Sequence, residues 1–214
     1  GGPLNESIIL SFTRYMNDAD VHVDEQWAKV SPGIYYRDFE KMTLPKHVYI
    51  PTFPASKSIC ALGGMVMNNS GGEQTLRYGQ TRDFVDEITM VLSDGNEYTF
   101  RNLHRNELEE QMQQDNFWGK IHRKVFNLLE KNYDIIKAAK PKTSKNSAGY
   151  ALWDIWDKEW FRLPQLFVGS QGTLGLMTNA RIRLVRDKPH KRLVALFLKD
   201  WEHLPNIVNR LLPI

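Results

Sequence analysis

Short apolar runs, some alternating with polar residues, predict a series of strands along the chain. Residues 7–12 form a β-prone apolar run, which we predict to be a buried strand. Residues 85–92 and 97–100 flank a Ser-Asp-Gly-Asn turn, which is typical of a β-hairpin. Residues 176–185 alternate as a strand directly after a glycine-rich loop. Further strands are predicted over residues 22–30, 48–50 and 192–198.

Three segments have the pattern of helices. Residues 35–44 predict a short helix that ends before Pro45, and residues 202–212 predict another near the end of the chain. Over residues 106–139, apolar side chains recur at three- and four-residue steps, which predicts an amphipathic helix. The polar, proline-containing segment Asp187-Lys-Pro-His between the last strands is the best candidate for a domain boundary.

Composition narrows the class of protein. The 214 residues are enough for one sizeable domain, or for one domain and part of another. Hydrophobic residues make up 42% and charged residues 25%, which excludes disordered and fibrous classes. The net charge of +3 is too small to argue for nucleic acid. The single cysteine excludes an internal disulfide and a cysteine-based metal site.

Two glycine-rich stretches stand out against this ordinary background. The first, residues 58–72, places four glycines and the pair Asn68 and Asn69 around a short apolar run. Glycine lets the backbone approach a flat or anionic ligand closely, and asparagine offers both donors and an acceptor. A turn-rich connection between two strands is the alternative. The second stretch, residues 169–175, favours a ligand shared by the two loops.

Other common sites do not match the sequence. Neither glycine stretch is a P-loop, because no Gly-Lys-Ser/Thr follows, and neither has the spacing of a dinucleotide-binding fingerprint. Ser170 is not in a nucleophile elbow, because Val168 occupies the position that requires glycine. The six histidines are scattered, so we expect no metal site. Arg82 and Asp83 form a local ion pair or cap, with binding of a substrate carboxylate as the alternative.

Several ordered motifs resemble one known family. They are residues 54–56, 62–72, 77–83, 88–95, 145–150 and 166–178. Together these motifs, spread over residues 7–186, are similar to those of the FAD-linked oxidases of the vanillyl-alcohol oxidase type. Within that family, the D-lactate, glycolate and D-2-hydroxyglutarate dehydrogenases are the most similar.

The resemblance implies a fold and a cofactor. It implies an α+β fold, the second subdomain of a PCMH-type FAD-binding domain, in which helices flank a mixed or antiparallel sheet. FAD would be the cofactor. The implied cofactor-binding residues are Pro54, Ala55, Ser56, Ser58, Ile59, Cys60, Gly63, Gly64, Asn68, Asn69, Gly72, Gln171, Gly172, Gly175, Leu176 and Met177. Gln171 departs from the family, which usually has glutamate there.

The resemblance also implies a division of the chain. Residues 1–187 would belong to the FAD-binding domain, and residues 188–214 would begin a ferredoxin-like substrate or cap domain. The family's first pyrophosphate-binding loop and its catalytic residues have no match here, so we expect a middle fragment of a larger flavoenzyme. We therefore expect this chain alone to bind FAD weakly or not at all, and to be inactive by itself.

The implied activity is FAD-dependent oxidation of a 2-hydroxy acid by hydride transfer to the flavin. Electrons would pass to a quinone, a cytochrome or an electron-transfer protein. Two alternatives stay open: a flavoenzyme of the same fold acting on another alcohol, sugar or ether-lipid precursor, and a non-catalytic scaffold. We expect a cytoplasmic protein, and a peripheral position at a membrane stays open as well.

Overall fold

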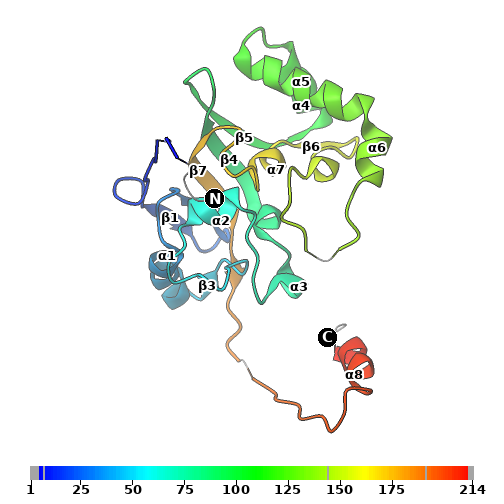
Figure 1. Ribbon diagram of the computed structural model, residues 1–214. Coiled ribbons are helices and arrows are strands. Elements are labelled where there is room, and N and C mark those ends of the chain that lie inside the picture. The colour runs from blue at the N-terminus through cyan, green and yellow to red at the C-terminus, as the bar shows by residue number, and fades with distance from the viewer. Residues whose placement is uncertain (1–4, 7, 144, 191, 212–214) are drawn as a thin grey trace.

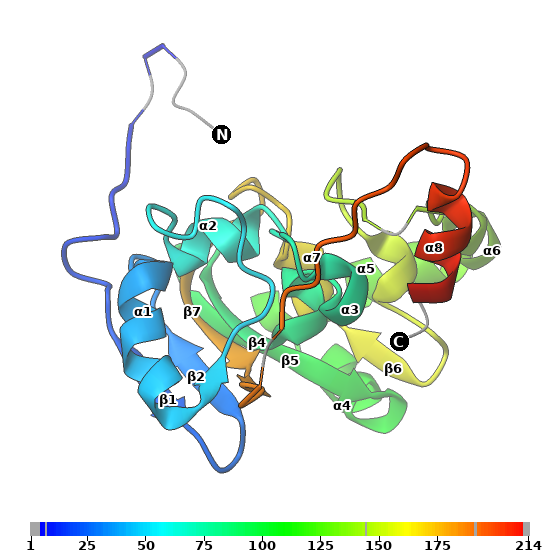
Figure 2. The ribbon, with the colours of Figure 1, turned by 90° about the horizontal axis from the view of Figure 1, so that it is seen from below.

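The computed structural model describes residues 5–6, 8–143, 145–190 and 192–211, and its centre is one antiparallel sheet. Six strands pair in the order β1-β2-β7-β4-β5-β6, and helices lie around them (Figures 1 and 2). The combination of helices with an antiparallel sheet confirms the predicted α+β class. The six strands are β1 (Ala19–His22), β2 (Trp27–Val30), β4 (Val85–Val91), β5 (Glu97–His104), β6 (Trp160–Arg162) and β7 (Leu176–Arg183).

The middle of the sheet matches the sequence well. β4 and β5 form the predicted hairpin, with Ile88 opposite Phe100, and Asp94 accepts a hydrogen bond from the backbone N–H of Asn96 in the turn. β7 pairs with β4 on one side and with β2 on the other. Because β7 directly follows the second glycine stretch, the sheet fixes where that loop leaves the core.

The strand predicted over residues 22–30 is instead part of a hairpin. β1 and β2 pair with Val21 opposite Ala28, and the chain turns between them with Gln26 in the left-handed region at φ 56°. Polar residues at 24–26 suit an exposed turn better than a continuous strand. A smaller two-stranded sheet pairs β3 (Val48–Tyr49) with β8 (Val185–Arg186), which confirms the short strand predicted near residue 48.

The helices are shorter than predicted. The single helix expected over residues 106–139 is three helices, because Asn116 caps the second one and Asn132 separates it from the third. The side chain of Asn116 accepts a hydrogen bond from the N–H of Gly119 at 2.8 Å. The helices are α1 (Tyr36–Thr43), α2 (Leu62–Met67), α3 (Thr75–Tyr78), α4 (Arg105–Gln113), α5 (Phe117–Lys131), α6 (Tyr133–Ala138), α7 (Pro164–Phe167) and α8 (Leu204–Leu211).

Aromatic side chains join the helices to the sheet. Trp118 of α5 stacks on Phe100 of β5 with ring centroids 4.8 Å apart, and Phe167 of α7 packs on the same ring at 4.7 Å. Trp156 and Phe161 are also buried in this core. Trp160, by contrast, is 38% exposed.

Two predicted strands are absent from the described residues. Residues 8–12 of the predicted run 7–12 are extended but unpaired, and residue 7 lies outside the described part. Residues 192–198 are also unpaired, with Leu193 97% and Phe197 95% exposed. A strand needs a neighbour for its backbone hydrogen bonds, and the described chain supplies none at either place. The helix predicted after residue 202 is confirmed as α8.

Candidate functional site

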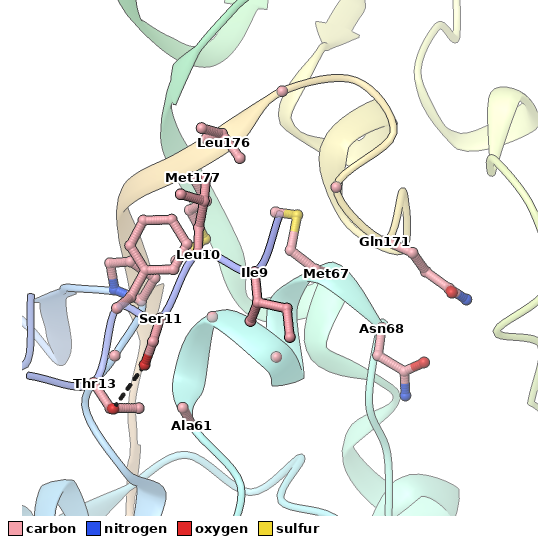
Figure 3. A pocket seen from close by; sticks show the side chains of 17 residues that line it. Ile9, Leu10, Ser11, Thr13, Ala61, Met67, Asn68, Gln171, Leu176 and Met177 are labelled. Carbon is pink, nitrogen blue, oxygen red and sulfur yellow. Dashed lines mark hydrogen bonds between the residues drawn. The ribbon is translucent and has the colours of Figure 1, made fainter. Parts of the chain in front are cut away.

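A cavity of about 500 Å³ lies where the two glycine stretches meet (Figure 3). Its floor is α2, and its other walls are the extended segment 9–13 and the loop that leads into β7. Its lining is Ile9, Leu10, Ser11, Phe12, Thr13, Pro32, Gly33, Ala61, Gly63, Gly64, Met67, Asn68, Gln171, Gly172, Gly175, Leu176 and Met177.

The first glycine stretch folds into a short helix rather than a simple turn. The N–H of Gly63 donates to the carbonyl of Pro32 at 2.9 Å, which ties α2 to the loop after β2. A Cβ on Gly63 would lie 2.6 Å from the Pro32 Cβ, so glycine is required there by packing. A Cβ on Gly64 would meet no atom of the described chain within 4 Å, so its open side is free for a ligand.

The second glycine stretch is tied to the end of the same helix. The N–H of Gly169 donates to the carbonyl of Val66 at 3.0 Å, and that of Gln171 donates to Met67 at 2.8 Å. The second bond pairs the Met67 carbonyl at the end of α2, while the Val66 carbonyl also accepts from the N–H of Asn69 at 3.0 Å. The structure therefore brings together, along one cavity, two stretches that are about a hundred residues apart in the sequence.

The cavity has apolar walls and a polar edge. Leu10, Met67 and Met177 contribute apolar side chains, while the amides of Asn68 and Gln171 lie at one side (Figure 3). A flat aromatic ligand with a polar edge matches this distribution, because apolar walls cover its faces and amides can donate and accept at its rim.

Asn69 is placed differently from its neighbour. It is completely buried, in the left-handed region at φ 47°, and is not part of the cavity lining. Its side-chain oxygen accepts a hydrogen bond from the N–H of Arg82 at 2.9 Å, and its amide nitrogen donates to Asn146 at 3.4 Å. Of the two asparagines predicted to reach the ligand, only Asn68 lies at the cavity.

Half of the predicted cofactor residues line the cavity: Gly63, Gly64, Asn68, Gln171, Gly172, Gly175, Leu176 and Met177. The stretch 54–60 lies ahead of α2 as a turn, in which the N–H of Cys60 donates to the carbonyl of Ser56 at 3.0 Å. Gly72 packs against the Phe53 carbonyl, which a Cβ would meet at 2.1 Å. Outside the lining are Pro54, Ala55, Ser56, Ser58, Ile59, Cys60, Asn69 and Gly72, whose contacts with a cofactor stay a prediction.

Nine lining residues were not among the predicted ones: Ile9, Leu10, Ser11, Phe12, Thr13, Pro32, Gly33, Ala61 and Met67. The backbone of Phe12 passes so close to Gly33 that a Cβ there would lie 2.2 Å from the Phe12 carbonyl oxygen. The Ser-Pro-Gly sequence at residues 31–33 indicates a close backbone approach. The sequence does not indicate that the approaching segment is the one around Phe12.

Within the described residues, no group of three or more His, Cys, Asp and Glu side chains could hold a metal ion. In the same part of the chain, no helix is both long and apolar enough to span a bilayer.

The first half of the chain matches a known domain family. Residues 1–101 match the family described as FAD binding domain. Over these residues the chain is similar to the FAD-linked oxidases of the vanillyl-alcohol oxidase type, the family that its motifs resemble.

Individual dehydrogenases and an oxidase subunit are similar to most of this chain. The chain is 28% identical over 198 residues to D-2-hydroxyglutarate dehydrogenase of Escherichia coli K12, covering 91% of the chain and 19% of that protein. It is 30% identical over 198 residues to the glycolate oxidase subunit GlcD of Bacillus subtilis 168, covering 91% and 31%. It is 26% identical over 206 residues to D-lactate dehydrogenase of Archaeoglobus fulgidus, covering 96% and 35%. The chain thus spans between about a fifth and a third of these relatives.

The cavity fits the cofactor of the FAD-linked oxidases. The open side of Gly64 allows a planar ring to lie against α2, where a side chain would otherwise stand. The apolar walls and the amides of Asn68 and Gln171 suit the faces and the polar edge of an isoalloxazine ring.

Proposed function

We propose that this chain supplies one wall of the flavin site of an FAD-dependent dehydrogenase that oxidises a 2-hydroxy acid, such as D-lactate, glycolate or 2-hydroxyglutarate. The observation that carries the proposal is the cavity in which the two glycine stretches meet beside Gly64. The names of the similar FAD-linked oxidases, each a hydroxy-acid dehydrogenase or oxidase, support the substrate class.

In this proposal the chain's own residues bind and orient the cofactor. Gly63 and Gly64 let the backbone of α2 lie against the ring, while Met67 and Met177 exclude water from its faces. The amides of Asn68 and Gln171 hydrogen-bond the polar edge. Gln171 is neutral, so it can donate as well as accept, whereas the glutamate usual in the family could only accept when ionised. FAD, when bound, supplies the acceptor chemistry for oxidation of the C–OH group.

The remaining assignments are also proposals. We place the domain boundary after Asp187, so that residues 1–187 serve the cofactor and residues 188–214 begin the substrate or cap domain. Leu193 and Phe197, which follow β8, are exposed, and the ribbon leaves the sheet in this segment (Figure 1), which supports this division. The electron acceptor would be a quinone, a cytochrome or an electron-transfer protein. The protein would be cytoplasmic or lie peripherally at a membrane.

The test is reduction of flavin by substrate in the proposed dehydrogenase to which this chain contributes, reconstituted with FAD. Glycolate, D-lactate and D-2-hydroxyglutarate are added separately without air, and the flavin absorbance is followed. We expect at least one of them to bleach the flavin, and its enantiomer, where one exists, to act more slowly. If every hydroxy acid leaves the flavin oxidised while another alcohol bleaches it, the substrate class is wrong. If FAD protects none of the cavity residues from chemical labelling, the site itself is wrong.

A further inference from the structure

A second, polar cavity lies apart from the flavin site and shares no lining residue with it. It has a volume of about 480 Å³ and opens beside η2, a 3₁₀ turn over Thr81–Phe84. Its lining is Arg82, Asp83, Val85, Asp86, Asn102, Lys140, Asp154, Arg162, Gln165 and Arg183. Four of these side chains are cationic and three are acidic, so the cavity carries one positive charge in excess.

Arg82 is the residue on which this cavity depends. Its side chain is 8% exposed, and its Nε has no hydrogen-bond partner within the described residues. The nearest carboxylate oxygen, from Asp154, is 3.9 Å from Nη1, which is too long for a hydrogen bond. A guanidinium stays protonated in proteins, and a buried N–H without a partner costs free energy.

The position of Arg82 is fixed through its backbone. Its N–H donates to the side-chain oxygen of Asn69 at 2.9 Å, and its carbonyl accepts from Nε2 of Gln165 at 2.8 Å. Both partners are buried. The guanidinium is therefore presented at a defined place and does not depend on a flexible surface loop.

The other cations of the cavity are already paired. Lys140 lies 2.9 Å from Asp154, Arg183 lies 3.3 Å from Asp86, and Arg162 lies 2.6 Å from Asp157. Among the described residues, Arg82 is thus the cation of this cavity that has no carboxylate oxygen closer than 3.9 Å. The cavity also contains a buried hydrogen-bond acceptor without a donor: no described residue donates to the Oδ1 of Asn102.

We propose that this second cavity binds a small oxyanion that carries an O–H group, hydrogen phosphate or a 2-hydroxycarboxylate, with Arg82 as its charge anchor. The anionic oxygens accept from Arg82, and the O–H donates to Asn102 or to the carboxylate of Asp86. An oxyanion without an O–H group satisfies Arg82 but meets the lone pairs of Asp86 and Asn102. The cavity should therefore bind an oxyanion that carries an O–H group more tightly than an oxyanion of similar shape and charge that lacks it.

Two pairs of matched anions test this directly by titration calorimetry on the chain at constant ionic strength and neutral pH. Phosphate is compared with sulfate, which has the same shape, and glycolate is compared with acetate, which lacks the hydroxyl. We expect at least one O–H-bearing anion to bind about tenfold more tightly than its partner. Whichever pair discriminates identifies the source of the ligand. Equal binding within both pairs, or no binding of phosphate and glycolate, overturns the proposal.

Three variants locate the site. Arg82→Gln should weaken the favoured anion about tenfold, whereas Arg105→Gln, in an exposed ion pair with Glu109, should not. Asp86→Asn leaves Arg82 in place but removes the carboxylate that repels an anion without an O–H group. It should therefore reduce the difference in affinity between phosphate and sulfate, or between glycolate and acetate. Gly64→Leu, in the flavin cavity, should leave anion binding unchanged. If Gly64→Leu loses the difference in affinity between the paired anions, or if Asp86→Asn keeps it in full, the anion does not bind in the second cavity.

Discussion

The N–H of Gly63 donates to the carbonyl of Pro32 at 2.9 Å, and a Cβ on Gly63 would lie 2.6 Å from the Pro32 Cβ. The next residue, Gly64, has open space where its Cβ would be. Two adjacent glycines thus have separate roles. Gly63 lets α2 pack against the loop after β2, and Gly64 keeps the cavity side of the helix bare.

This relationship predicts opposite phenotypes for two neighbouring substitutions. Gly63→Ala should lower the free energy of unfolding by about 1–3 kcal/mol, because the methyl group overpacks against Pro32. Gly64→Leu should fold normally, since replacing a helical glycine is favourable, but should lose FAD. Thermal unfolding of the chain followed by circular dichroism measures the first effect, and titration with FAD of the proposed dehydrogenase to which this chain contributes measures the second. Loss of folded protein in Gly64→Leu, or FAD binding equal to that of the unsubstituted dehydrogenase, would contradict the assignment.

Asn68 and Asn69 should also separate binding from stability. Asn69→Ala should cost about 1–3 kcal/mol of stability, because the buried N–H of Arg82 loses its acceptor. Asn68→Ala, at an exposed position, should change stability by less than about 0.5 kcal/mol but weaken FAD binding. Urea unfolding and flavin fluorescence titration of both variants check this. The prediction fails if the two substitutions destabilise the chain equally.

His122 should make stability depend on pH. Its ring is 1% exposed and its Nδ1–H donates to the carbonyl of Trp118 at 2.9 Å, and burial lowers the pKa of His122. The native state therefore keeps the ring neutral, while the unfolded chain takes up a proton below a pH of about 6.5. Stability should fall as pH falls through this value, by at most about 1.4 kcal/mol per pH unit. Urea unfolding at several pH values should show that slope, and His122→Gln should reduce it; an unchanged slope would exclude His122.

The cap of α5 is a further point of stability. Asn116 accepts a hydrogen bond from the N–H of Gly119, which would otherwise lack an intrahelical acceptor. Asn116→Ala should lower the free energy of unfolding by about 1 kcal/mol. Asn116→Asp should lower it much less, because aspartate also caps a helix. Gln113→Ala, at an exposed position of α4, serves as the control and should have little effect. Equal losses in Asn116→Ala and Asn116→Asp would show that the cap is not the cause.

The sequence by itself determined the elements whose signals are local. The Asp94-Gly95 turn specified the hairpin of β4 and β5, and alternation specified β7. The glycine stretches at 58–72 and 169–175 indicated close backbone approach, and their order along the chain indicated the family. These local patterns correctly predicted the folded structure because each depends on only a few consecutive residues.

Only the tertiary structure decided features that need a distant partner. Residues 8–12 look like a strand but have no neighbouring strand in the described chain, and residues 9–12 line the proposed flavin cavity instead. Asn68 and Asn69 are equivalent in sequence, yet the left-handed backbone of Asn69 and the N–H of Arg82 hold one inside and leave the other at the cavity. A ligand site forms where segments distant in the sequence pack together, whereas a local sequence pattern specifies only one of those segments.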